Sequence, residues 1–77
     1  MPYRRFQILL EWDAEAGAWV TYVPALNALS TFGETRDEAL ANTREAIVGY
    51  LEAARKEQLP IPFTVESIDL EVEVPIA

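Results

Sequence analysis

The pattern of hydrophobic and polar positions in the first half of the chain predicts three short strands. Apolar and polar side chains alternate over residues 6–12, which is the period of a half-buried strand. After a short connection at 13–17, residues 18–23 are rich in aromatic and β-branched side chains, and Pro24 ends this second strand. Residues 26–32 form a third candidate strand. The short connection makes an antiparallel hairpin of the first two strands the expected arrangement.

A long amphipathic helix follows the strands. Thr35 and Glu38 form a capping box, in which the Thr35 hydroxyl accepts from the Glu38 amide and the Glu38 carboxylate reaches back to the Thr35 amide. Apolar residues then recur at three- and four-residue spacing from residue 40 to residue 54. Pro60 and Pro62 cannot continue a helix, so we expect it to end before them.

The last part of the chain alternates again. Residues 66–74 place apolar side chains on one face and acidic side chains on the other, which predicts a final strand. The expected order is βββαβ within a single small α+β domain over residues 1–77. Its antiparallel-rich sheet carries the one long helix on one face.

Composition narrows the chemistry. The chain has 77 residues, with no cysteine and no histidine. Disulfides, nearly all zinc and copper sites, and nucleophilic triads based on histidine or cysteine are therefore excluded. The three glycines build no nucleotide-binding loop, so we expect no cofactor and no metal. A core of this size gives only a small free energy of unfolding, so we expect the chain to gain stability by self-association.

The charge balance points away from nucleic acid. Six basic residues stand against 13 acidic ones, giving a net charge of −7, and no large basic cluster exists to neutralise phosphates. A basic protein partner would instead be attracted, although acidity also simply keeps small proteins soluble. The chain shows no membrane-length apolar run and no secretory leader, so a cytoplasmic location is expected.

Three stretches are candidates for contact with a partner or a second copy. Trp19 and Thr21 share one face of the second strand, and one of that strand's two faces must lie away from the helix. Gly49 costs the helix about 1 kcal/mol relative to alanine and lies outside the apolar stripe, as does Val48. The third candidate stretch is the acidic face of the predicted final strand. Core packing, neutral drift and a solvated edge are the alternative explanations for these candidates, which are Trp19, Thr21, Val48, Gly49, Asp69, Glu71 and Glu73.

An ordered set of short motifs gives the chain a family resemblance. Residues 33–42 match Gly-x-Thr-x-x-Glu-Ala-Leu-x-Asn, after Trp12-Asp13 and a Val-Pro-x-Leu step at 23–26, and before the Leu-Pro-Ile-Pro exit at 59–62. In this order and spacing, the chain resembles the N-terminal domain of the HicB-like antitoxin family over residues 3–75. It departs from the family at Ala28-Leu29, where Gly-Cys is usual.

The resemblance implies a function that periodicity alone does not. Family members typically mask a small, basic, double-stranded-RNA-binding-like mRNA interferase, and many continue into a DNA-binding domain, which we expect this chain to lack. The implied role is a non-catalytic protein-binding module that neutralises such a toxin, or an orphan relative of one. An oligomeric small-ligand or regulatory module is the alternative. A magnesium-dependent nuclease is a more distant one, with candidate carboxylates Glu11, Asp13, Glu15, Glu34 and Glu38.

Overall fold

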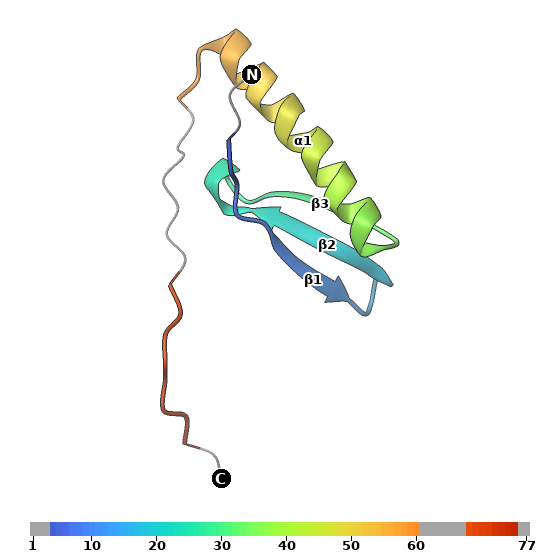
Figure 1. The fold of residues 1–77 in the computed structure, drawn as a ribbon, viewed down its shortest axis with the longest axis vertical. Coiled ribbons are helices and arrows are strands. Elements are labelled where there is room, and N and C mark those ends of the chain that lie inside the picture. Colours follow the sequence, from blue (N-terminus) through green and yellow to red (C-terminus); the bar gives the residue numbers. More distant parts are fainter. Residues whose placement is uncertain (1–3, 61–67, 76–77) are drawn as a thin grey trace.

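A three-stranded antiparallel sheet and one long helix make up the folded body. The computed structural model describes residues 4–60 and 68–75. Strands β1 (Leu9–Asp13), β2 (Ala18–Val23) and β3 (Leu29–Gly33) lie in the order β1-β2-β3, and helix α1 (Arg36–Glu57) packs across one face of the sheet (Figure 1). This is the α+β domain that the sequence predicts, with the regular elements in the order βββα.

The β1–β2 connection is built by Asp13 and Gly17. The Asp13 carboxylate accepts from the amides of Glu15 and Ala16 at 3.0 and 3.1 Å, and the Asp13 carbonyl accepts from the Gly17 amide at 2.8 Å. Gly17 has a φ of 63°, a conformation that favours glycine. The hairpin register then pairs Trp12 with Trp19.

The third strand starts later than the sequence pattern predicts. Pro24–Leu26 forms a short 3-10 turn, η1, which buries Ala25 and Leu26. Asn27 and Ala28 then adopt left-handed backbone conformations, with φ of 57° and 55°. The strand therefore begins at Leu29, because the proline-initiated turn takes up the residues that precede it. Similarly, the β1 ladder begins at Leu9, and residues 4–8 lie outside it.

The core between sheet and helix is small. Its fully buried side chains are Val23 and Leu26 with two threonines, supplemented by several alanines. Several large apolar side chains stay exposed on the body, with Trp12 at 51% and Phe32 at 68%. Burial of this extent supports only marginal stability in isolation.

The end of α1 follows the sequence closely. Gln58 takes a φ of 56°, and the Leu59 amide donates to the Ala54 carbonyl at 2.9 Å, which ties off the last turn. Across the described ranges 4–60 and 68–75, no helix has the length and apolarity needed to cross a membrane.

The predicted final strand has no strand partner in this structure. Residues 68–74 are extended and exposed, and no described strand pairs with them, so the order among the described residues is βββα and the final strand stays a prediction. Glu66 and Ser67 lie outside the described residues. An extended segment needs a neighbouring strand to satisfy its backbone groups in a ladder, and residues 68–75 lie away from the sheet (Figure 1).

A candidate protein-interaction surface

The glycine-to-asparagine motif at 33–42 fixes how the helix sits on the sheet. A Cβ added to Gly33 would lie 2.5 Å from the backbone nitrogen of Ala39 and 2.9 Å from the carbonyl carbon of Glu38. Ala39 is itself completely buried. Only glycine at position 33 allows the end of β3 to approach the first turn of α1 this closely.

The helix cap differs in one bond from the predicted capping box. Thr35 is the N-cap, and its side-chain hydroxyl accepts from the Glu38 amide at 3.0 Å. The Glu38 carboxylate accepts from the amide of Glu34 at 3.3 Å, one residue before the Thr35 amide that the sequence pattern predicts. Both bonds hold the β3–α1 corner in place.

Three threonine hydroxyls join the sheet to the helix inside the core. Thr43 Oγ1 lies 2.5 Å from Thr21 Oγ1 and 3.0 Å from Thr31 Oγ1, and it donates to the Ala39 carbonyl at 2.7 Å. The Thr43 hydroxyl thus has three oxygen atoms within hydrogen-bond distance, one from the helix backbone and two from the sheet. These bonds establish that Thr21 and Thr31 lie on the helix-facing side of the sheet. Because side chains alternate along a strand, their immediate neighbours lie on the other side.

A shallow hollow at the β3 edge is lined by residues of β3, including Phe32, and by polar and acidic residues of α1. Asn42 donates from Nδ2 to the Phe32 carbonyl at 2.8 Å and so ties α1 to this edge. The hollow has a volume of about 530 Å³, and the Phe32 side chain stays 68% exposed beside it. Two carboxylates contribute to its lining. We call this region the Phe32 surface, formed by Ser30, Phe32, Glu38, Asn42, Glu45 and Ala46.

The Phe32 surface continues onto the sheet face opposite the helix. Val20 pairs with Phe32 across β2 and β3, and Leu9 pairs with Tyr22 across β1 and β2. The Tyr22 hydroxyl donates to the Glu11 carboxylate at 3.4 Å. This face therefore offers apolar and aromatic side chains with polar groups among them, a composition typical of protein–protein contact sites.

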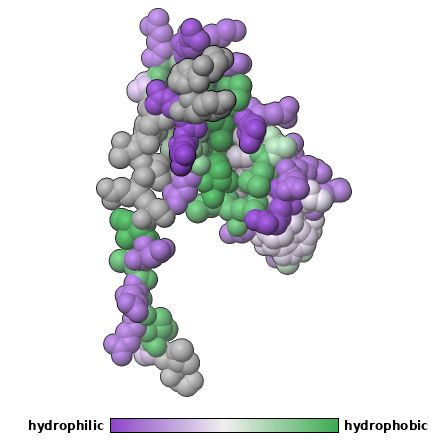
Figure 2. Space-filling view, in the orientation of Figure 1, coloured by the Kyte–Doolittle hydropathy of each residue, from purple (hydrophilic) through white to green (hydrophobic). Residues whose placement is uncertain are grey.

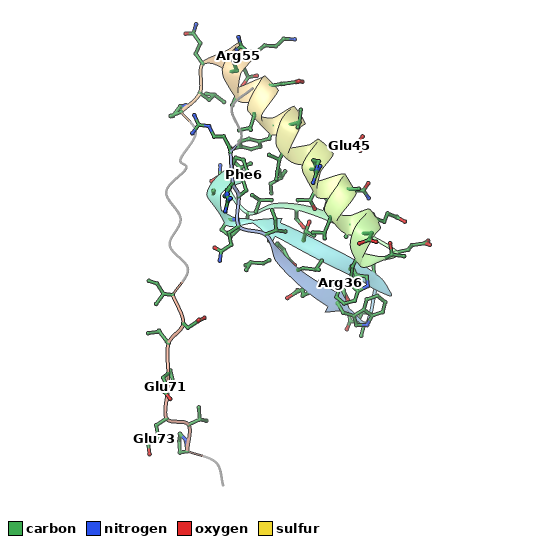
Figure 3. All side chains as sticks on the ribbon, in the orientation of Figure 1. Phe6, Arg36, Glu45, Arg55, Glu71 and Glu73 are labelled. Carbon is green, nitrogen blue, oxygen red and sulfur yellow. The ribbon has the colours of Figure 1, made fainter. Side chains whose placement is uncertain are left out.

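Trp19 and Thr21 lie on the helix-facing side of the sheet. Thr21 is 0% exposed, so it offers no surface to a partner. The Trp19 ring is half-buried, with the Arg36 guanidinium 5.8 Å from its centroid and the Trp12 ring edge-on at 5.4 Å (Figure 3). The face of β2 away from the helix belongs instead to Val20 and Tyr22, and the interface role of Trp19 stays a prediction.

The remaining predicted interface residues are exposed, but they lie on different parts of the chain. Val48 and Gly49 lie on α1, and Val48 is 50% exposed. Asp69, Glu71 and Glu73 lie on the extended segment 68–75, far from the Phe32 surface (Figure 3). All five residues are therefore accessible to a partner, and their interface role stays a prediction.

Three of the five candidate carboxylates for a metal site accept hydrogen bonds from separate local groups. Asp13 accepts amides in the hairpin turn, Glu38 accepts the Glu34 amide, and Glu11 accepts the Tyr22 hydroxyl. Within the described residues, no group of three or more acidic, histidine or cysteine side chains is placed to hold a metal ion. The β3 edge is therefore better suited to contact with a partner molecule, through Phe32 and the nearby carboxylates, than to metal binding.

Sequence reasoning missed Phe32 and Asn42 as site residues. Phe32 lies in the third candidate strand, and its face could not be assigned before the strand's start was known. Asn42 is the last residue of the Gly33–Asn42 motif, and its place in the motif was the only sequence feature that could have identified it. Its hydrogen bond to the Phe32 carbonyl explains why the motif ends in asparagine.

Comparisons with known proteins identify the family of this chain. The family model for the HicB-like antitoxin of bacterial toxin–antitoxin systems matches residues 6–75. The UPF0150 protein Ta0767 of Thermoplasma acidophilum is 40% identical over 58 residues, covering 75% of this chain and 83% of the relative. No solved structure matches. With a family model that spans nearly the whole chain and a relative this similar, the chain belongs to the HicB-like antitoxins of bacterial toxin–antitoxin systems.

Proposed function

We propose that this chain is a non-catalytic, protein-binding antitoxin domain that neutralises a small basic toxin through the Phe32 surface. The observation that carries the proposal is the 68% exposure of Phe32 at a sheet edge whose hollow Glu38 and Glu45 also line. Family membership supports a toxin–antitoxin role, and the toxin class is the mRNA interferase that the resemblance implies. Such a toxin works on mRNA, so the proposed location is the cytoplasm.

The chemistry of the surface suits a basic partner. Full burial of an aromatic side chain of this size contributes about 1.5–3 kcal/mol, and exposed aromatic rings are common anchors at interfaces. The net charge of −7 would steer a cationic protein toward the chain and raise the association rate more than the final affinity. Neutralisation then follows from coverage, because a bound antitoxin excludes RNA from the basic surface that the toxin uses.

Co-expression with any small basic protein whose gene adjoins the gene of this chain tests the proposal. We expect the two proteins to co-purify at low salt, and the purified complex to cleave mRNA more slowly than the free basic protein. Failure of the two proteins to associate at low salt would contradict the proposal. Association without any loss of RNA cleavage would contradict the neutralising mechanism.

The second candidate function is an oligomeric small-ligand module, and one observation favours it. A groove of about 730 Å³ runs between residues 4–8 and α1, a volume within the range of small-molecule sites. A ligand module would bind a small molecule there and would not need the neighbouring basic protein. Failure to capture that protein, together with thermal stabilisation by a metabolite, would favour this alternative.

A further inference from the structure

The two tryptophans of the chain meet near the turn of the β1–β2 hairpin. Trp12 pairs with Trp19 across the two strands, and the ring centroids are 5.4 Å apart with an interplanar angle of 62°. The Arg36 guanidinium lies 5.8 Å from the centroid of the Trp19 ring, and Figure 3 shows Arg36 at this corner of the molecule. We call Trp12, Trp19 and Arg36 the tryptophan corner.

Trp12 stays exposed because it lies on a strand that the helix leaves largely uncovered. The helix packs over β3 and β2, whereas β1 is the edge strand on the other side of the sheet. Trp12 therefore faces the helix side, as its partner Trp19 does, and is still 51% exposed. The end of the hairpin forms a pale surface of intermediate hydropathy between hydrophilic side chains (Figure 2). Since tryptophan is among the side chains most enriched at binding hot spots, this corner is a candidate contact site.

The tryptophan corner already shows which kind of group it accepts. A cation over the face of an aromatic ring is attracted by the ring's negative face, and tryptophan gives the strongest attraction of the aromatic side chains. Arg36 makes such a contact with Trp19. Because the two rings meet edge-on, their contact does not cover the faces of both rings, and Trp12 keeps accessible surface for a second cation.

Carboxylates adjoin the tryptophan corner in the sequence on both of its sides. Asp13 follows Trp12 directly, and two backbone amides of the turn hold its carboxylate in place. Glu34 and Asp37 lie close to Arg36 in the sequence, and both are exposed. Acidic side chains therefore outnumber basic ones at this end of the molecule. A polyanion such as RNA would be repelled here, and a cationic side chain would be attracted.

We propose that the tryptophan corner is a second anchor site, at which the basic partner of this chain places an arginine side chain on the exposed Trp12 ring. Arginine fits better than lysine, because a planar guanidinium stacks on an aromatic ring and still offers its N–H groups to a neighbouring carboxylate. Asp13 is the nearest carboxylate in the sequence. The source of the arginine rests on the proposed function, whereas the preference of the corner for a guanidinium does not.

The tryptophan corner and the Phe32 surface lie at the same end of the sheet. Trp19 pairs with Gly33, which directly follows Phe32, but the side chains of Trp19 and Phe32 face opposite sides of the sheet. A partner that contacts both sites would therefore reach around this end of the sheet. Two separate anchors fix the orientation of a bound partner, which one exposed ring cannot do.

Titration of the full wild-type chain with N-acetyl-argininamide tests the chemistry of the corner without the partner. The indole N–H signals in an NMR spectrum report on this corner alone, because the chain has two tryptophans and both lie here. We expect the Trp12 indole signal to shift about fivefold more with this probe than with N-acetyl-citrullinamide, in which a neutral urea group replaces the guanidinium. Equal shifts from the two probes, or no shift at Trp12, would overturn the proposal.

A comparison of two Trp12 variants separates this proposal from the proposed function. The measurement is the affinity for a small basic protein whose gene adjoins the gene of this chain, with circular dichroism used to check that each variant is folded. We expect Trp12→Leu to weaken the complex about tenfold, and Trp12→Phe, which keeps an aromatic ring, to weaken it less than about threefold.

The outcomes of this comparison are distinct. A complex that Phe32→Ala weakens and Trp12→Leu leaves unchanged would overturn the second anchor site and leave the proposed function standing. Equal weakening by Trp12→Leu and Trp12→Phe would also overturn it, because the aromatic ring would then not matter. If the wild-type chain forms no complex, the proposed function fails, and a Trp12 shift specific to the arginine probe still supports the corner as a guanidinium site.

Discussion

Replacing Thr43 by valine should destabilise the domain strongly, although valine has nearly the same shape as threonine. The Thr43 hydroxyl bonds to Thr21, Thr31 and the Ala39 carbonyl, and it is the centre of the only hydroxyl cluster described between sheet and helix. Valine removes these bonds and leaves the buried Thr21 hydroxyl with only its longer contacts, to Thr31 Oγ1 at 3.3 Å and to the Thr31 carbonyl at 3.5 Å. Each lost hydrogen bond contributes about 0.5–1.5 kcal/mol, so the three together make a loss of about 2 kcal/mol or more the expected result.

The destabilisation expected for Thr43→Val is a large fraction of the domain's free energy of unfolding. A domain of this length has a total unfolding free energy of about 4–12 kcal/mol. A loss of about 2 kcal/mol lowers the midpoint of thermal unfolding by about 8–16 °C in a domain of this size. Urea unfolding followed by tryptophan fluorescence measures the change. Every variant should be compared at one protein concentration, since self-association raises apparent stability.

The double variant provides the sharper test of the cluster. In a chain with both Thr21→Val and Thr43→Val, two buried hydroxyls that bond each other are removed together, so the combined loss should be smaller than the sum of the single losses by about 0.5–3 kcal/mol. Thr43→Ser is the matched control, because it keeps the hydroxyl and removes only a methyl group. A neutral Thr43→Val, or strictly additive single and double variants, would refute the role given to these hydroxyls.

Other predictions concern the motif that docks the helix. Gly33→Ala should cost about 1–3 kcal/mol, because its Cβ would meet the Ala39 backbone, whereas Gly49→Ala should stabilise the helix by about 0.5–1 kcal/mol, because nothing lies within 4 Å; equal effects in urea unfolding would contradict this. Thr35→Ala should cost about 0.5–2 kcal/mol and Thr35→Asp far less, as measured by thermal melts followed by circular dichroism; the reverse order would contradict the cap. Asn42→Ala should cost about 1 kcal/mol and speed exchange of amides at the β3 edge; unchanged exchange would argue against the bond to the Phe32 carbonyl.

The sequence carried enough information for the elements whose signals are local. The capping residue Thr35, the turn at Gly17 and the amphipathic helix all depend on neighbours within a few positions, and the structure places them as expected. The family motif was recognisable for the same reason. The structure shows that Gly33, Ala39 and Asn42 mainly serve to dock the helix, so this motif identifies the fold more directly than it identifies a partner surface.

The features that sequence analysis left open or missed depend on long-range pairing. Alternation divides β2 into two faces, but only the bond between Thr21 and Thr43 tells which face meets the helix. For the same reason, the sequence did not show that the Phe32 side chain lies on the exposed face of the sheet. The final strand was predicted from a correct alternation, yet a strand also needs a partner edge, and periodicity says nothing about which chain supplies it.

The central claim, that the Phe32 surface binds a basic toxin, is tested most directly by one affinity measurement. The chain is titrated with a small basic protein whose gene adjoins its own, and Phe32→Ala is compared with Leu59→Ala, a similarly exposed apolar position beyond the end of α1. We predict a complex that Phe32→Ala weakens at least tenfold, about 1.4 kcal/mol or more, and that Leu59→Ala leaves within threefold. Equal affinities for the two variants, or no complex at low salt, would contradict the claim.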